Sequence, residues 1–130
     1  MKMNRDYKRR NEILGIPFEE GAKENVEINR LYRLSLDIVK KLFKEKFIDP
    51  KDNQNSSPTA AQFLKFLRKY PFATVDVYTV PISKPDYRVM IEGLFISNKD
   101  KTSQVISDFF ELCKDAAEVS KDGHLIAWWN

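Results

Sequence analysis

The sequence predicts a small α+β domain in which helices pack on one face of a mostly antiparallel, three-stranded sheet. Three observations carry this prediction. Three segments repeat apolar residues at helical spacing, two neighbouring segments alternate apolar and polar residues as strands do, and a proline-rich turn separates those two segments. A chain of 130 residues with 42% hydrophobic residues suits one domain with its own core.

Two helices are expected in the first part of the chain. Residues 4–14 form a short one that ends at Gly15, because glycine favours the left-handed turn that often follows a helix. Residues 25–47 show the clearest pattern. Their apolar side chains fall on one wide face, and Asn25 can cap the first turn.

Two more helices are expected further along the chain. One begins with Ser57 as its N-cap and ends before Pro71, since the residue before a proline disfavours the helical conformation. The other spans residues 102–119 and places Cys113 on its buried face.

Strands are expected at residues 73–80, 88–96 and 124–129. The first two form an antiparallel hairpin, and Gly93 marks a bulge in the second. After the short N-terminal helix, the element order is therefore α-α-β-β-α-β. A right-handed crossover through the helix at 102–119 would return the last strand parallel to the second, with the first strand in the middle of the sheet.

The two adjacent tryptophans must leave opposite faces of the last strand. The alternation that buries Leu125 and Ala127 sends Trp129 toward the helices and Trp128 to the outer face. The alternative register buries Ile126 and Trp128. We expect the first of these, because the small Ala127 leaves room for a closely packed helix.

Positive charge gathers at the N-terminus. Residues 1–10 hold five basic residues and one acid, whereas the rest of the chain is close to neutral. We therefore divide the chain into a basic arm or peripheral segment, residues 1–22, and a single α+β domain, residues 23–130. Because the expected core begins after the arm, deletion of residues 1–10 should change the stability by less than about 1 kcal/mol. The arm residues that could contact phosphates are Lys2, Arg5, Lys8, Arg9 and Arg10.

The sequence offers little catalytic or metal-binding chemistry. Its one histidine, His124, has no accompanying G-x-S-x-G motif, and its one cysteine, Cys113, lies beside acids that disfavour a thiolate. One Cys and one His are too few for a structural zinc site, and no glycine-rich phosphate loop is present. We predict no catalytic residue, no metal and no cofactor, and a binding protein rather than an enzyme.

The sequence also suggests a compartment. No segment approaches the run of about 20 apolar residues that spans a bilayer, and no secretory signal is evident. A single free cysteine fits a reducing compartment. We expect a soluble protein of the cytoplasm that does not enter the membrane.

The aromatic side chains suggest where a partner binds. An outward-facing Trp128 would share the outer sheet face with Tyr78, near the basic Lys84 and Arg88. Such a surface suits a partner protein, an aromatic ligand or single-stranded bases, unless the arm, the first helix or a second copy of the chain covers it. Among these we expect a partner protein, and a second copy of the chain, forming a homodimer, is one such partner. The predicted function is therefore a protein-interaction module. The alternative is a nucleic-acid-binding accessory protein that uses the basic arm, and steeply salt-dependent retention on DNA or RNA would favour it.

Overall fold

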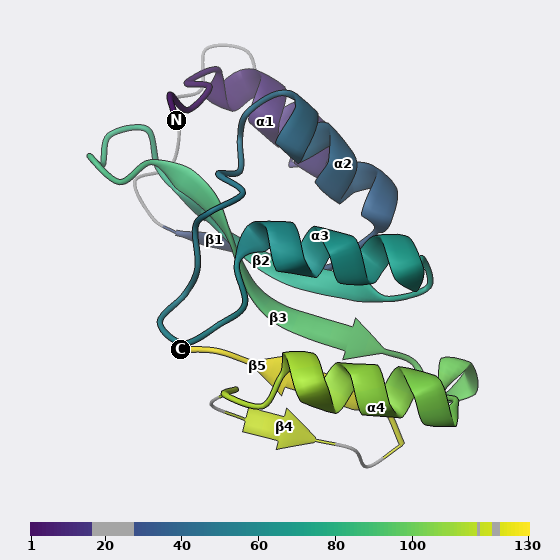
Figure 1. Cartoon of the computed structure of the whole chain (residues 1–130). Helices are drawn as coiled ribbons and strands as arrows, with labels where there is room; N and C mark the ends of the chain where they lie inside the picture. Colours follow the sequence, from purple (N-terminus) through teal and green to yellow (C-terminus); the bar gives the residue numbers. More distant parts are fainter. Residues whose placement is uncertain (17–27, 117, 121–122) are drawn as a thin grey trace.

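The computed structural model describes residues 1–16, 28–116, 118–120 and 123–130. Helices and strands are interspersed along the chain (Figure 1). In chain order the elements are α1 (Tyr7–Leu14), β1 (Asn29–Leu34), α2 (Leu36–Lys44), α3 (Ala60–Lys69), β2 (Thr74–Val80), β3 (Arg88–Ile96), the 3₁₀ helix η1 (Asn98–Asp100), α4 (Ser103–Leu112), β4 (Glu118–Ser120) and β5 (Leu125–Trp128). The predicted α+β class is confirmed.

The five strands of the described residues form one sheet in the order β1-β2-β3-β5-β4. Every pairing in it is antiparallel. The predicted three-stranded sheet with a parallel last strand is wrong, because β4 follows α4 and the chain reverses once more before β5. β5 therefore runs antiparallel to β3, and β3 rather than β2 is the central strand.

The segment 25–47, predicted as one helix, forms a strand and a helix. β1 pairs with β2 at the edge of the sheet. Ser35 then caps α2, because its side chain accepts a hydrogen bond from the Ile38 backbone N–H at 3.5 Å. The apolar spacing of residues 25–47 predicted a single helix, but Leu31 packs against the core from a strand. A residue that contacts the core produces the same apolar position in either kind of element. Asn25, the expected N-cap, lies outside the described residues.

Two further boundaries differ from the prediction. Thr59, not Ser57, is the N-cap of α3, and it forms a reciprocal capping box with Gln62. α4 ends at Leu112 with Cys113 as its C-cap, and β4 begins at Glu118, inside the range 102–119 that was expected to be helical. A strand of three residues is too short to show an alternating pattern, so the sequence does not separate it from a helix end.

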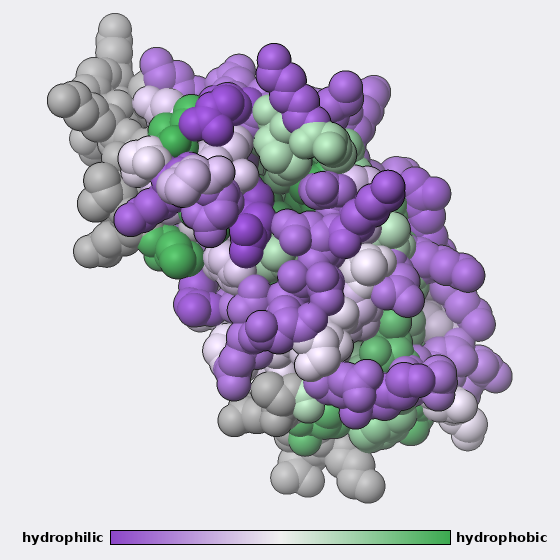
Figure 2. All heavy atoms as spheres, turned by 60° about the vertical axis from the view of Figure 1, so that its left-hand side comes forward, coloured by the Kyte–Doolittle hydropathy of each residue, from purple (hydrophilic) through white to green (hydrophobic). Residues whose placement is uncertain are grey.

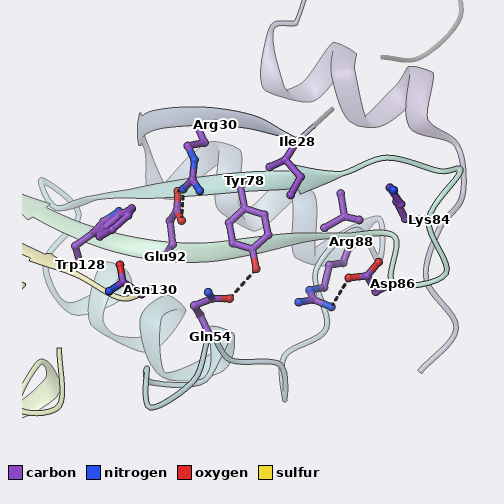
Figure 3. Close-up of a pocket in the computed structure, with 11 residues that line it drawn as sticks. Ile28, Arg30, Gln54, Tyr78, Lys84, Asp86, Arg88, Glu92, Trp128 and Asn130 are labelled. Carbon is purple, nitrogen blue, oxygen red and sulfur yellow. Dashed lines mark hydrogen bonds and ion pairs between the residues drawn. The ribbon is translucent and has the colours of Figure 1, made fainter. Parts of the chain in front are cut away.

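β2 and β3 form the predicted antiparallel hairpin, and the predicted bulge near Gly93 is confirmed. Asp76 pairs with Gly93, whereas the next residue, Val77, pairs with Ile91. Glu92 is therefore the extra residue of the bulge. Met90 and Glu92 alternate with the core residues Val89 and Ile91, so the Glu92 carboxylate lies on the same sheet face as the Tyr78 ring (Figure 3). The bulge then returns Leu94 to the core face.

The main core lies between the sheet and the helices. In Figure 1, α3 and α4 lie in front of the sheet, with α2 above α3. One continuous cluster of buried residues joins these helices to the strands; it includes Val39, Phe63, Phe109, Val77 and Ile91. A separate small cluster, Tyr78, Val80 and Met90, is buried on the other sheet face, where the described helices do not lie.

The last strand has the predicted register. Leu125 and Ala127 are buried, and Trp129 is only 1% exposed. Trp129 packs edge-on against Phe63 of α3, with 5.4 Å between the ring centroids. Trp128 is half-buried and faces the opposite side of the sheet (Figure 3). The structure thus confirms that one indole belongs to the core and the other to the outer face.

The N-terminal segment is fastened to the end of α2. The Asn4 backbone N–H donates a hydrogen bond to the Lys46 carbonyl at 2.9 Å. Arg9 binds the Glu45 carboxylate through its Nε and Nη2, each at 2.8 Å. This hydrogen bonding is the main reason that the pKa of Glu45 lies below its usual value.

Two arginines of the same segment enclose Tyr87. The guanidinium carbons of Arg5 and Arg10 lie 5.1 and 5.4 Å from the centre of the Tyr87 ring, and Arg10 is buried. Arg5 also donates a hydrogen bond to the Ile82 carbonyl at 2.9 Å. Residues 81–87 connect β2 to β3, so these contacts hold the connection against the N-terminal segment.

These contacts change the expected result of truncation. Deletion of residues 1–10 removes both guanidinium groups from Tyr87 and the hydrogen-bond donors from the Lys46 and Ile82 carbonyls. We now expect the free energy of unfolding to fall by about 2 kcal/mol. Urea unfolding followed by circular dichroism measures the change, with Lys2→Ala, at an exposed side chain, as the control. A truncated protein of wild-type stability would contradict this expectation.

Candidate functional site

A pocket of about 460 Å³ opens on the sheet face turned away from the helices (Figure 3). It contains all four residues that the sequence predicted for binding, Tyr78, Lys84, Arg88 and Trp128. They come from β2, the β2–β3 connection, β3 and β5. The other lining residues are Ile28, Arg30, Gln54, Val80, Asp86, Glu92 and Asn130. We call this site the outer-face pocket.

Strand pairing explains why these distant residues meet. Arg30 of β1 pairs with Tyr78 of β2, and Gly93 of β3 pairs with Trp128 of β5. Directly paired residues of antiparallel strands project from the same face of the sheet. The floor of the outer-face pocket is therefore assembled across four strands, and no single segment of the chain contains it.

The absence of a side chain at Gly93 leaves space for the Trp128 indole. A Cβ atom on Gly93 would lie 3.0 Å from Trp128 Cδ1 and 3.0 Å from Asp76 Oδ2, closer than side chains normally approach. Any other residue at this position would have to displace the indole or the carboxylate. The glycine thus sets the position of the aromatic end of the pocket.

An ion pair crosses the middle of the outer-face pocket. Arg30 Nη1 lies 2.5 Å from Glu92 Oε1 and 2.6 Å from Oε2. The Glu92 side chain is 3% exposed, whereas that of Arg30 is 47% exposed. The Arg30 guanidinium carbon also lies 5.9 Å from the centre of the Tyr78 ring and 5.8 Å from that of Trp128. A buried carboxylate thus holds a solvent-facing cation between two aromatic rings.

The other end of the pocket is polar. Arg88 Nε lies 3.4 Å from Asp52 Oδ2, and its Nη1 lies 3.6 Å from Asp86 Oδ2. Both distances exceed those of strong charge-assisted hydrogen bonds. Lys84 is exposed at the edge of the pocket (Figure 3). This end therefore offers basic groups whose hydrogen-bonding capacity is only partly used.

Three contributors to the site were missed by the sequence analysis. Arg30 lay within the segment read as a helix, although Ser35 followed by Asp37 is a helix-start pattern that could have separated the two elements. Glu92 is an acid in an otherwise apolar strand, which signals a buried partner. Gln54, which accepts a hydrogen bond from the Tyr78 hydroxyl at 2.6 Å, comes from a polar loop that carried no signal.

The predicted nucleic-acid arm is placed differently from the expectation. Arg5, Arg9 and Arg10 all make the internal contacts described above. The side chains of Lys2 and Lys8 are exposed. The arm therefore offers fewer cations to phosphate than its sequence suggested.

His124 and Cys113 lie outside the lining of the outer-face pocket. His124 Nδ1 accepts a hydrogen bond from the Asn98 backbone N–H at 3.0 Å, and its ring lies 5.2 Å from that of Phe95. Cys113 is buried at the end of α4. In the part of the chain that the structure describes, no cluster of three or more His, Cys, Asp or Glu side chains could hold a metal ion.

Cys113 should be unreactive in the native protein, because burial raises the pKa of its thiol to about 12. A thiol reagent at pH 8 is expected to label it slowly until denaturant is added. Cys113→Ser should lower the free energy of unfolding by roughly 1–3 kcal/mol, because it places a hydroxyl in an apolar site. Rapid labelling of the folded protein would show that the thiol is accessible.

Comparison with known protein families, with curated proteins and with solved structures finds no match to this chain. Among the described residues, no helix has the length and apolar character needed to cross a bilayer. The fold and the site together define a small α+β protein with a cation–aromatic pocket on the sheet face away from its helices.

Proposed function

We propose that the protein is a non-enzymatic interaction module that binds a segment of a partner protein in the outer-face pocket. The observation that carries the proposal is the convergence of Tyr78, Lys84, Arg88 and Trp128 in one hollow. Trp, Tyr and Arg are the side chains that most often dominate binding energy at protein interfaces. A half-buried Trp128 can anchor a partner while remaining in place when the partner is absent.

The pocket is organised before any partner arrives. Glu92 fixes Arg30, Gln54 fixes the Tyr78 hydroxyl, and the bulge and Gly93 set the place of Trp128 (Figure 3). Side chains that are already ordered lose less conformational entropy on binding. This preorganisation supports a recognition site rather than a chance hollow in the surface.

The chemistry of the lining favours binding over covalent catalysis. None of the described residues that line the pocket is a serine, threonine, cysteine or histidine. Glu92 is already bound to Arg30 in an ion pair, and two aspartates lie near Arg88. Because these charges are largely compensated, we expect stacking and apolar contact to supply most of the affinity.

The exposed surface of the described residues suggests an interface of modest size. The exposed large hydrophobic side chains lie on several elements: Ile28 lines the outer-face pocket, Ile126 lies two residues before Trp128 on β5, and Ile106 and Phe110 lie one turn apart on α4. Figure 2 shows one face of the molecule on which hydrophilic residues predominate and hydrophobic ones form small separate areas. Obligate interfaces are larger and more apolar than this. We therefore propose a reversible contact with a partner protein or with a second copy of the chain.

Selection of displayed peptides tests the proposal. Peptides that bind the wild-type protein should bind Trp128→Ala at least about tenfold more weakly. Phe72→Ala removes another exposed aromatic side chain, outside the pocket, and should bind like the wild type. If the peptides bind the wild type, Trp128→Ala and Phe72→Ala equally well, the binding site lies outside the outer-face pocket. Sedimentation velocity of the same variants tests self-association, which Trp128→Ala should weaken if the pocket mediates it.

A further inference from the structure

We infer that the protein has a second binding surface, the groove between α2 and α3, and that this groove takes an acidic, amphipathic segment of a partner protein. The groove has a volume of about 660 Å³ and belongs to the helix side of the molecule. It shares no lining residue with the outer-face pocket. The inference is therefore independent of the function proposed above.

Uncompensated positive charge is the first observation. The groove is lined by Lys40, Lys41 and Lys44 of α2 and Arg68 of α3, against one acid, Asp37. None of these four cations forms an ion pair with a described residue. Like charges gathered without partners repel one another, and an anionic ligand would relieve that repulsion.

The nearest acid outside the groove is shared with another cation. Glu45 follows directly after Lys44 and attracts Lys41 and Lys44 without an ion pair, whereas both of its carboxylate oxygens accept hydrogen bonds from Arg9, each at 2.8 Å. Basic residues near the end of a helix also suit its dipole. The dipole accounts for basic residues on each helix separately, but it does not account for cations of two helices facing a common groove.

The apolar part of the groove selects the class of partner. Phe43 and Leu64 line it and are only partly buried, so carbon surface lies between the cations. A phosphate backbone would contact the charges and leave this surface unused. A polypeptide that alternates acidic and apolar side chains at helical spacing would use both, as helices bound in grooves do. The geometry therefore favours an acidic amphipathic peptide over a nucleic acid.

Fluorescence anisotropy with a defined probe tests the inference. The probe is a labelled peptide of roughly 18 residues, with leucine at positions i, i+3, i+4 and i+7 and glutamate on the remaining faces. We expect Lys40→Glu combined with Arg68→Glu to weaken its binding by at least about tenfold. Leu64→Ala should weaken binding of this peptide but not of a pure oligoglutamate. Binding should also decline as salt is raised.

The controls separate the groove from overall charge and from the outer-face pocket. Lys99→Glu combined with Lys114→Glu makes the same change in net charge near α4, away from α2 (Figure 1), and should change the affinity less than about twofold. Trp128→Ala should bind the probe as the wild type does. If the charge-reversed groove variant does not fold, Lys40→Gln with Arg68→Gln carries the same prediction with a smaller loss.

Two results would overturn the inference. Equal loss of binding in the groove variant and in the control with matched charge would show attraction to net charge alone. Tighter binding of single-stranded oligothymidine than of the peptide, with loss in the groove variant, would assign the groove to nucleic acid. Neither result would bear on the outer-face pocket, which the peptide selection tests separately.

Discussion

Replacement of Trp129 by alanine is expected to lower the free energy of unfolding by about 3–5 kcal/mol, the range for large aromatic side chains removed from cores. Trp129 is 1% exposed and packs edge-on against Phe63, with an interplanar angle of 80°. Its backbone N–H also donates a hydrogen bond to the Glu92 carbonyl at 2.9 Å, which positions it beside the central strand. The cavity left by the indole would lie between β5 and α3, where the surrounding helix cannot collapse freely.

The adjacent Trp128 provides a matched control. Trp128→Ala removes the same side chain from the half-buried outer face and should cost only about 1 kcal/mol. The chain contains only these two tryptophans, so each variant leaves one emitter. We expect blue-shifted fluorescence from Trp128→Ala and red-shifted fluorescence from Trp129→Ala. Equal losses of stability in thermal and urea unfolding would show that the outer face is a second core rather than a binding surface.

Removal of Arg30 should produce the second large effect. Arg30→Ala leaves the Glu92 carboxylate, whose side chain is 3% exposed, without its cation. Breaking a buried pair from one side is costly because the remaining charge stays desolvated. Since Arg30 is itself about half exposed and water can enter its place, we expect a loss of about 2–4 kcal/mol. Urea unfolding at neutral pH measures it.

A double variant identifies the cause of that loss. Arg30→Ala combined with Glu92→Gln removes the unpaired charge and should recover at least half of the stability lost by Arg30→Ala alone. Lys69→Ala breaks a more exposed pair, Lys69 with Asp108, and should have a much smaller effect. No recovery in the double variant would mean that the contacts of Arg30 with the aromatic rings, rather than its ion pair with Glu92, stabilise the sheet.

Local sequence signals predicted the parts of the fold that depend on neighbouring residues. Gly15 ends α1 with a φ of 73°, Pro71 follows directly after the C-cap of α3, and the alternation around Ala127 gives the correct faces for both tryptophans. The bulge near Gly93 was also predicted. In each case a few adjacent residues carry the physical constraint, because backbone conformation or side-chain alternation is a local property.

Long-range pairing decided the rest. β1 shares its periodicity with an amphipathic helix, and only hydrogen bonding to β2 makes it a strand. The three-residue β4 exists through its pairing with β5, and it changes the direction in which β5 meets β3. The N-terminal segment likewise becomes part of the body through contacts with Tyr87 and Glu45, neither of which is near it in sequence.

In the outer-face pocket, too, some features follow from local sequence and others from long-range strand pairing. The sequence by itself predicted that Trp128 and Tyr78 face the outer side of the sheet, near Lys84 and Arg88, because side-chain alternation and turn composition depend on consecutive residues. Only the tertiary structure decided that Arg30 and Glu92 meet between the rings, since that contact needs an edge strand and a strand partner from distant parts of the chain. Side-chain direction is local, whereas juxtaposition depends on how the strands are ordered in the sheet.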